Sequence, residues 1–195
     1  MKLILASKSP RRREILENLG ISFEIVTAET DESSEERDPY RLVEQLSRRK
    51  GEAVQELLWR QGRTLDGTVI LSSDTVVCVD GEILGKPRDA ADARRMLRLL
   101  SGRAHRVISG VCLIGRGKVA VAHEVTEVCF DKLDDETVEA YIQACSPYDK
   151  AGAYAIQGHA AAFISGIKGC YFNVVGLPVH KLAVLWRETF GENFL

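Results

Sequence analysis

Two spacings of apolar residues recur along the chain, one typical of strands and the other of helices. Short apolar runs predict buried strands over 2–6, 23–26, 69–73, 76–79, 106–114 and 119–130. Amphipathic stretches predict helices from 10 to before Gly20, from 39 to 61, between Asp89 and Gly102, from 134 to 145, and from 178 onward. The Gly- and Ala-rich stretch 151–176 predicts strands and loops. Interleaved strands and helices favour a mixed α/β fold around one central sheet, with the whole chain 1–195 as a single domain.

The helix predicted over 39–61 carries one lysine on its apolar stripe. Lys50 lies four residues after Leu46 and three before Ala53, so helical spacing places all three on one face. Such a lysine either extends its stem along the apolar surface and keeps its ammonium in water, or directs the ammonium into a polar cleft beside the helix. The spacing alone leaves both interpretations open.

Composition narrows the class of protein. The chain is 45% hydrophobic and 28% charged, as in an ordinary globular protein. A net charge of −2 argues against a general nucleic-acid binder. No apolar run approaches the roughly 18 residues of a membrane span, and residues 1–6 are too short for a signal peptide. Five cysteines without a C-x-x-C spacing favour a reducing compartment, so we expect a cytoplasmic protein.

The small net charge conceals two charged blocks. Residues 1–13 hold five basic residues and no acid, whereas residues 29–38 hold six acids and one arginine. Either block alone is as compatible with a solvated face as with a site. Together they indicate an anion site beside a metal-binding edge.

The basic block follows the first predicted strand, where a helix begins. Ser9 is suited to the N-cap position and Pro10 to the first helical position. A helix N-terminus binds phosphate through its unpaired N–H groups, and arginine forks match phosphate oxygens. Because consecutive side chains on a helix point in different directions, at most two of the three arginines 11–13 can face one ligand. We expect Arg13 to be the exposed one.

Three further stretches contain candidate chemistry. Asp74 ends the predicted strand 69–73, where a carboxylate either caps a turn or serves a site. In 149–158, small residues surround Gln157 and would let its amide approach a flat base. The stretch 81–87 differs from a P-loop, because it has one residue too few between its glycines and Pro87 replaces the magnesium-binding hydroxyl. Lys86 can still reach a phosphate.

These segments together resemble the Maf family of nucleotide pyrophosphatases. The matching segments, in order, are 5–12, 73–77, 84–87, 99–102, 149–158 and 175–178. The resemblance implies a cytoplasmic hydrolase that cleaves a nucleoside triphosphate to the monophosphate and pyrophosphate with a divalent cation, Mg²⁺ or Mn²⁺. It also implies two lobes with a cleft between them, similar to inosine triphosphate pyrophosphatases, a homodimer, and a role in nucleotide-pool cleansing and cell-division arrest.

The resemblance assigns roles to individual residues. It implies Asp74 as the proton acceptor and Glu32 with Asp74 at the metal. It places around the triphosphate Ser7, Arg11, Arg12, Lys50 and Lys86. The residues themselves leave two roles open for Asp74, which either takes the proton of the attacking water or holds the metal that lowers the pKa of that water.

The resemblance also separates two branches of the family. Arg11, Thr75 and Gln157 match the branch that acts on dTTP and UTP, rather than the branch that acts on 7-methylguanosine triphosphate. Ser73 departs from that branch, which usually has alanine there, and Ala155 replaces a usual glycine.

A nucleotide-sensing regulator without turnover is the alternative function. Asp74 argues against it, because binding alone gains little from a carboxylate beside phosphates.

Overall fold

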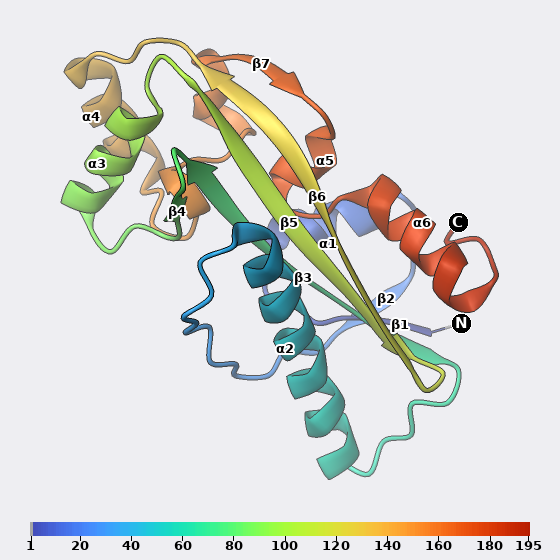
Figure 1. The fold of residues 1–195 in the computed structure, drawn as a ribbon. Coiled ribbons are helices and arrows are strands. Elements are labelled where there is room, and N and C mark those ends of the chain that lie inside the picture. Colours follow the sequence, from blue (N-terminus) through green and yellow to red (C-terminus); the bar gives the residue numbers. More distant parts are fainter. Residues whose placement is uncertain (1) are drawn as a thin grey trace. The chain divides into compact units, whose positions relative to one another are not determined.

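The central sheet contains both parallel and antiparallel strand pairs. The structure is a computed structural model that describes residues 2–195, and its strands follow the order β2-β1-β3-β5-β6-β7, with β4 paired to β3 (Figure 1). The strands are β1 Lys2–Leu5, β2 Phe23–Ile25, β3 Thr68–Val79, β4 Glu82–Leu84, β5 Ala104–Gly115, β6 Lys118–Phe130 and β7 Ile164–Lys168. Strand β1 is parallel to β2 and β3, whereas β4 and β7 run antiparallel to β3 and β6.

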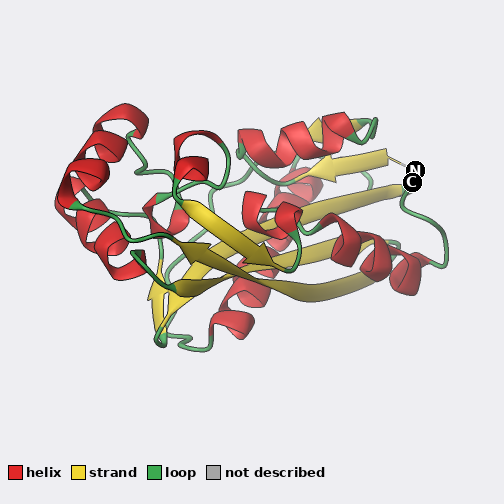
Figure 2. Cartoon of the chain, turned by 90° about the horizontal axis from the view of Figure 1, so that it is seen from above, coloured by secondary structure: helices red, strands yellow, loops and turns green. Residues whose placement is uncertain are grey.

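Helices join the strands and flank the sheet, which confirms the predicted α/β class (Figure 2). The α-helices are α1 Pro10–Asn18, α2 Pro39–Arg60, α3 Ala90–Leu100, α4 Asp135–Cys145, α5 Tyr171–Val175 and α6 Val179–Phe190, and the 3₁₀ helices are η1 Ala151–Ala153 and η2 Gly158–Ala162. Asp38, Asp89 and Asp134 cap α2, α3 and α4, each accepting a backbone N–H from the first turn.

The chain forms two compact units, and the three long strands β3, β5 and β6 contribute residues to both. Unit 1 contains residues up to Asp74, together with 109–124 and 176–195. Unit 2 contains 75–108 and 125–175. Of the predicted site residues, unit 2 holds Thr75, Lys86 and Gln157, and unit 1 holds all the others.

In unit 1, helix α2 lies close against β3 and β5 (Figure 1). The buried apolar cluster of this unit includes Ile4, Val54, Leu58, Ile70, Cys112 and Ile114. A Cβ added at Gly110 of β5 would lie 2.3 Å from the carbonyl oxygen of Val43, and one added at Gly51 of α2 would lie 2.8 Å from Ser72 Oγ. These two glycines therefore allow the helix and the strands to approach at backbone distance.

The core of unit 2 is aromatic. Edge-to-face contacts join Phe130 to Tyr154 at 4.8 Å and to Phe163 at 5.0 Å between ring centroids. His105 belongs to the same cluster, is 3% exposed, and has its Nε2 atom 2.7 Å from the hydroxyl oxygen of Tyr154. Burial lowers the pKa of His105 from 6.5 to about 4, so this histidine is neutral at pH 7.

Strand β3 corrects the prediction of two strands with Asp74 at the end of the first. It is continuous over Thr68–Val79, and Asp74 lies in its middle. The polar residues Ser72, Ser73 and Asp74 are buried but have hydrogen-bond partners outside the strand. Because their polar atoms are satisfied in this way, the strand passes through them without a break.

Two local expectations at other places are also corrected. Ser9 is at the N-cap position of α1, but its side chain makes no capping bond, and Ser7 Oγ instead accepts the N–H of Ser9 at 3.2 Å. The stretch 151–176 contains one strand, β7, but also the short helices η1, η2 and α5, which its Gly and Ala content did not predict.

The remaining expectations concern membrane spans and cysteines. No helix within residues 2–195 is long and apolar enough to cross a bilayer. All five cysteines are free thiols, and Cys112 is fully buried. Burial raises the pKa of Cys112 to about 12, so this thiol packs as a small apolar group.

Candidate active site

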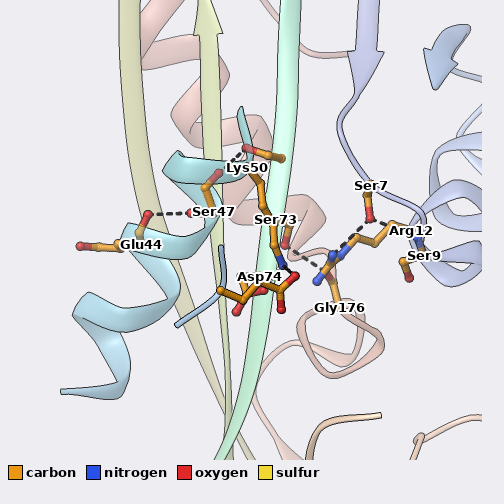
Figure 3. A network of polar contacts seen from close by, with 11 residues as sticks. Ser7, Ser9, Arg12, Glu44, Ser47, Lys50, Ser73, Asp74 and Gly176 are labelled. Atoms are coloured by element: carbon orange, nitrogen blue, oxygen red, sulfur yellow. Dashed lines mark hydrogen bonds and ion pairs between the residues drawn. The ribbon is translucent and has the colours of Figure 1, made fainter. Parts of the chain in front are cut away.

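The carboxylate of Asp74, in the middle of β3, contacts an ammonium from α2. Lys50 Nζ lies 2.5 Å from Asp74 Oδ1 (Figure 3) and 3.0 Å from Glu32 Oε1. The side chains of Asp74 and Lys50 are 11% and 18% exposed, whereas that of Glu32 is 49% exposed. The ammonium of Lys50 is therefore directed at acidic groups, as in the second of the two interpretations of its place on the apolar stripe.

A second polar cluster surrounds the start of α1. Arg12 Nε donates to the carbonyl oxygen of Gly176 at 2.7 Å, and Arg12 Nη1 donates to Ser7 Oγ at 3.2 Å (Figure 3). The hydroxyl of Ser73, on β3, donates to the same Gly176 carbonyl at 3.1 Å. Three chain segments that are distant in sequence thus meet at one carbonyl group, that of the residue two positions before the N-cap of α6.

The guanidinium of Arg12 lies among charged groups. Burial lowers the pKa of its guanidinium, the nearby charge of Asp74 raises it in part, and the neighbouring charge of Arg11 lowers it. A guanidinium stays protonated at neutral pH even so. The guanidinium of Arg12 is thus a fixed positive charge close to the carboxylate of Asp74.

The other arginines of the basic block behave as their spacing predicts. Arg11 is half-buried, whereas Arg13 is exposed and pairs with Glu17 one turn later, with 2.7 Å between Nε and Oε1. The expectation that Arg13 is the exposed arginine is confirmed. The binding role of Arg11 stays a prediction.

The predicted residues of unit 2 occupy a different environment. Thr75 is half-buried in β3, whereas Lys86 and Gln157 are exposed. The N–H of Gly152 donates to the carbonyl oxygen of Gly85 at 3.0 Å, so the segments 84–87 and 149–158 are adjacent within this unit. The structure thus brings the segments that contain Lys86 and Gln157 together in unit 2. In unit 1 it brings together Ser7 with Arg12 and Lys50 with Asp74.

Two polar groups of the network were missed as site residues by the sequence analysis. Gly176 lies in one of the six matching segments, but its contribution is a backbone carbonyl, which carries no side-chain signal. Ser73 was noted only as a departure from the related branch. Its position next to Asp74 in a buried strand was the available signal, because a buried hydroxyl needs a partner.

The two carboxylates predicted at the metal converge on one positive group. Oxygens of Asp74 and Glu32 lie within 3.0 Å of the same Lys50 Nζ atom. Among residues 2–195, no set of three or more His, Cys, Asp and Glu side chains could hold a metal ion. Mg²⁺ is typically held by one or two carboxylates together with substrate phosphates and water. Asp74 and Glu32 fit that kind of site, provided that phosphate oxygens complete it.

Fold and geometry define an α/β protein in which two cationic side chains, Lys50 and Arg12, lie near the buried carboxylate of Asp74. Comparison with known sequences assigns the family. The sequence profile of the family described as Maf-like protein matches residues 2–189, and the chain belongs to this family.

Relatives with assigned names match nearly the whole chain. The chain is 49% identical to the dTTP/UTP pyrophosphatase of Symbiobacterium thermophilum, over 97% of this chain and 94% of that protein. It is 48% identical to the protein of the same name from Chromobacterium violaceum, over 97% and 95%. Among solved structures, that of the Staphylococcus aureus Ham1 protein is similar with a TM-score of 0.47 and 12% identity, over 67% of this chain and 72% of that chain.

Proposed function

We propose that this protein hydrolyses dTTP and UTP to the nucleoside monophosphate and pyrophosphate. One observation carries the proposal: a buried carboxylate, Asp74, contacts the ammonium of Lys50 and lies in the field of the Arg12 guanidinium. The 49% identity to a protein named dTTP/UTP pyrophosphatase supports the same reaction. A carboxylate beside cations suits a site that both binds phosphates and activates water.

The cations bind the triphosphate. Ser7, Arg11 and Arg12 present a hydroxyl and two guanidiniums at the N-terminus of α1, where the helix dipole also favours an anion. Lys50 reaches the same triphosphate from α2. The family resemblance implies that Lys86 binds the triphosphate as well. Charge spreads over the phosphate oxygens in the transition state, so these fixed cations stabilise it more than they stabilise the bound substrate.

Asp74 accepts the proton of the attacking water. Its Oδ1 atom accepts a hydrogen bond from Lys50 Nζ. Phosphate oxygens compete for that ammonium, and Asp74 then accepts a hydrogen bond from water. The water oxygen bonds to phosphorus, the anhydride bond between the α- and β-phosphates breaks, and pyrophosphate leaves with the electron pair of that bond. One water proton goes to Asp74, which later returns it to solvent.

A divalent cation, Mg²⁺ or Mn²⁺, would be held by Glu32, Asp74 and phosphate oxygens. When bound, such an ion polarises phosphoryl oxygens and neutralises phosphate charge. The protein contributes the carboxylates of Glu32 and Asp74. An oxygen of each lies within 3.0 Å of the positively charged Lys50 Nζ atom.

Arg11, Thr75 and Gln157 would set the preference for a pyrimidine base. The amide of Gln157 offers a donor and an acceptor, a pair that can match neighbouring groups on the edge of uracil or thymine. A site built on such hydrogen bonds rejects a base that leaves the amide unpaired. We further propose a homodimer in the cytoplasm, which follows the family resemblance and the cysteine content.

A panel of nucleoside triphosphates tests the function. Purified protein is given dTTP, UTP, GTP and 7-methylguanosine triphosphate, with and without Mg²⁺ or Mn²⁺, and released pyrophosphate is measured. We expect kcat/KM for dTTP and UTP at least about tenfold above the two guanine substrates, since a base with a mismatched hydrogen-bonding edge leaves the polar groups that contact it unpaired. A preference for the methylated guanine substrate would place the protein in the other branch. Tight nucleotide binding without pyrophosphate release would make it a nucleotide sensor.

A further inference from the structure

We propose that Ser72 and Ser73 are positioning residues that place the two cations of the site separately, one on each face of β3. The proposal rests on the proposed function, because it concerns how Lys50 and Arg12 are held for a triphosphate. Both serines are fully buried, and they immediately precede Asp74 in the same strand. Neither has a role in the reaction described above.

Strand geometry sends the two hydroxyls in opposite directions. Successive side chains of a strand point to opposite faces of the sheet. Ser72 Oγ donates to the carbonyl oxygen of Ser47 in α2, at 2.6 Å. Ser73 Oγ donates to the carbonyl oxygen of Gly176 on the other face, at 3.1 Å (Figure 3). Each serine therefore fixes a different backbone segment to β3.

The segment fixed by Ser73 orients Arg12. The Gly176 carbonyl accepts both from Ser73 Oγ and from Arg12 Nε, and the second bond is 2.7 Å long. A carbonyl oxygen has two lone pairs and can accept both bonds at once. Ser73 thus holds the acceptor in place, and the acceptor fixes the direction of the guanidinium.

The segment fixed by Ser72 carries Lys50. Ser47 lies one helical turn before Lys50, so a bond to the Ser47 carbonyl holds the turn from which Lys50 extends. Gly51 follows Lys50, and a Cβ at that position would lie 2.8 Å from Ser72 Oγ and 2.9 Å from Ile114 Cδ1. The glycine lets the helix approach β3 closely enough for Lys50 to reach Asp74.

The hydrogen bonds at Gly176 permit substitutions that remove one of its two side-chain donors and leave the other. Removal of the Ser73 hydroxyl leaves Gly176 bonded to Arg12, and removal of the Arg12 side chain leaves Gly176 bonded to Ser73. The Gly176 carbonyl therefore keeps one side-chain donor in either variant. Alanine at 73 is smaller than serine and is compatible with the space available.

The test is a set of double-mutant cycles. Ser72→Ala and Ser73→Ala are each combined with Lys50→Met and with Arg12→Ala, and KM and kcat for dTTP are measured for every variant together with its melting temperature. Each serine serves as the matched control for the other, because they are adjacent, equally buried and chemically identical. If the serines have only a structural role, their substitution should change the melting temperatures. The effect of each serine on KM should then not depend on which cation is present.

We expect a crossed pattern in KM. Ser73→Ala should raise KM about three- to tenfold in the wild type and with Lys50→Met, but less than about twofold with Arg12→Ala, because the residue it positions is then absent. Ser72→Ala should show the reverse pattern. It should raise KM in the wild type and with Arg12→Ala, but hardly at all with Lys50→Met. In all single serine variants kcat should stay within about threefold, since Asp74 is unchanged.

Additive effects in every background would overturn the proposal, and so would coupling of each serine to both cations. If dTTP and UTP are not hydrolysed, the same cycles are measured as the Kd of inorganic tripolyphosphate. Crossed coupling in that binding would sustain the positioning roles while the proposed function fails. No crossed coupling there, or no tripolyphosphate binding by the wild type, would overturn the positioning roles as well.

Discussion

In unit 1 the polar residues of the family segments contact one another, whereas in unit 2 the same kind of segment packs into an aromatic core. Lys50 and Asp74 pair across α2 and β3, and Arg12 and Ser73 share the Gly176 carbonyl. In unit 2, Tyr154 lies in contact with His105 and Phe130 and is 5% exposed. The residues of the matching segments therefore differ in role. In unit 1 they position charged side chains, and in unit 2 they pack in the core.

Gly152 is an example of a residue in a matching segment of unit 2 that has a packing role. Its φ is +67°, in the left-handed region that favours glycine, and an added Cβ would lie 2.9 Å from Val77 Cγ2. Its N–H donates to the Gly85 carbonyl. Gly152 thus serves packing and a turn, and the approach of a base to Gln157 stays a prediction. Substitutions in unit 1 should consequently lower activity more than stability, and those in the aromatic core of unit 2 should do the opposite.

The largest effect is expected at Asp74. Asp74→Asn keeps the shape of the side chain but cannot accept a proton, and should lower kcat by about 10²- to 10⁴-fold. The melting temperature should change little compared with the loss of activity. Asp66→Asn, at an exposed position before β3, is the control and should keep full activity. A kcat of Asp74→Asn within about threefold of wild type would exclude Asp74 as the base.

Lys50→Met should raise KM for dTTP by roughly ten- to a hundredfold, because charge-assisted bonds to phosphate contribute about 1.5–3 kcal/mol. Methionine preserves the apolar stem on the buried side of α2, so the melting temperature should move less than KM implies. Lys181→Met, which loses a half-exposed lysine of α6 from the same unit, should leave KM unchanged. A lower melting temperature with an unchanged KM would make Lys50 a structural residue only.

The aromatic core of unit 2 should respond to pH through His105. The pKa of this histidine is lowered by burial to about 4 in the folded protein, against 6.5 when unfolded. Below pH 6.5 the unfolded chain takes up a proton that the folded protein refuses until about pH 4. Stability from this residue is therefore complete above pH 6.5 and is lost as the pH falls, by about 2 kcal/mol between pH 7 and pH 5.

Urea unfolding at pH 7 and pH 5 measures this loss. His105→Phe removes the titrating group and should be less stable at pH 7, because the Tyr154 hydroxyl loses its partner, yet its stability should depend less on pH. The exposed His180→Gln variant should retain the pH dependence of the wild type. If His105→Phe and wild type lose stability equally between pH 7 and pH 5, His105 does not carry the effect.

The smallest expected effect concerns base preference, which involves residues of both units. The triple variant Arg11→Trp, Thr75→Gln and Gln157→Glu should lower the ratio of dTTP to 7-methylguanosine triphosphate turnover by about tenfold. A control triple with Arg13→Trp in place of Arg11→Trp should shift the ratio less, because Arg13 is exposed and paired with Glu17. An equal shift in both triples would remove Arg11 from the specificity residues.

The sequence by itself determined most of the elements and the chemical class of the site. Helix α2, predicted over 39–61, occupies Pro39–Arg60, and Asp38, Asp89 and Asp134 precede the helices that they cap. These features depend on neighbours a few residues apart, namely side-chain periodicity and capping. The lysine on an apolar stripe and the basic block before α1 were visible for the same reason, because an unusual residue type in a regular pattern needs no tertiary information.

Only the tertiary structure decided which interpretation of those residues holds. Lys50 pairs with Asp74, 24 residues away, and Arg12 meets Gly176, 164 residues away. The continuity of β3 through Asp74 has the same origin, because its serines find partners in α2 and before α6 rather than within the strand. A local sequence pattern indicates the secondary structure and the polarity of a position. The hydrogen-bond partner of a buried polar group comes from a distant chain segment that reaches it only on folding, so a local pattern does not identify it.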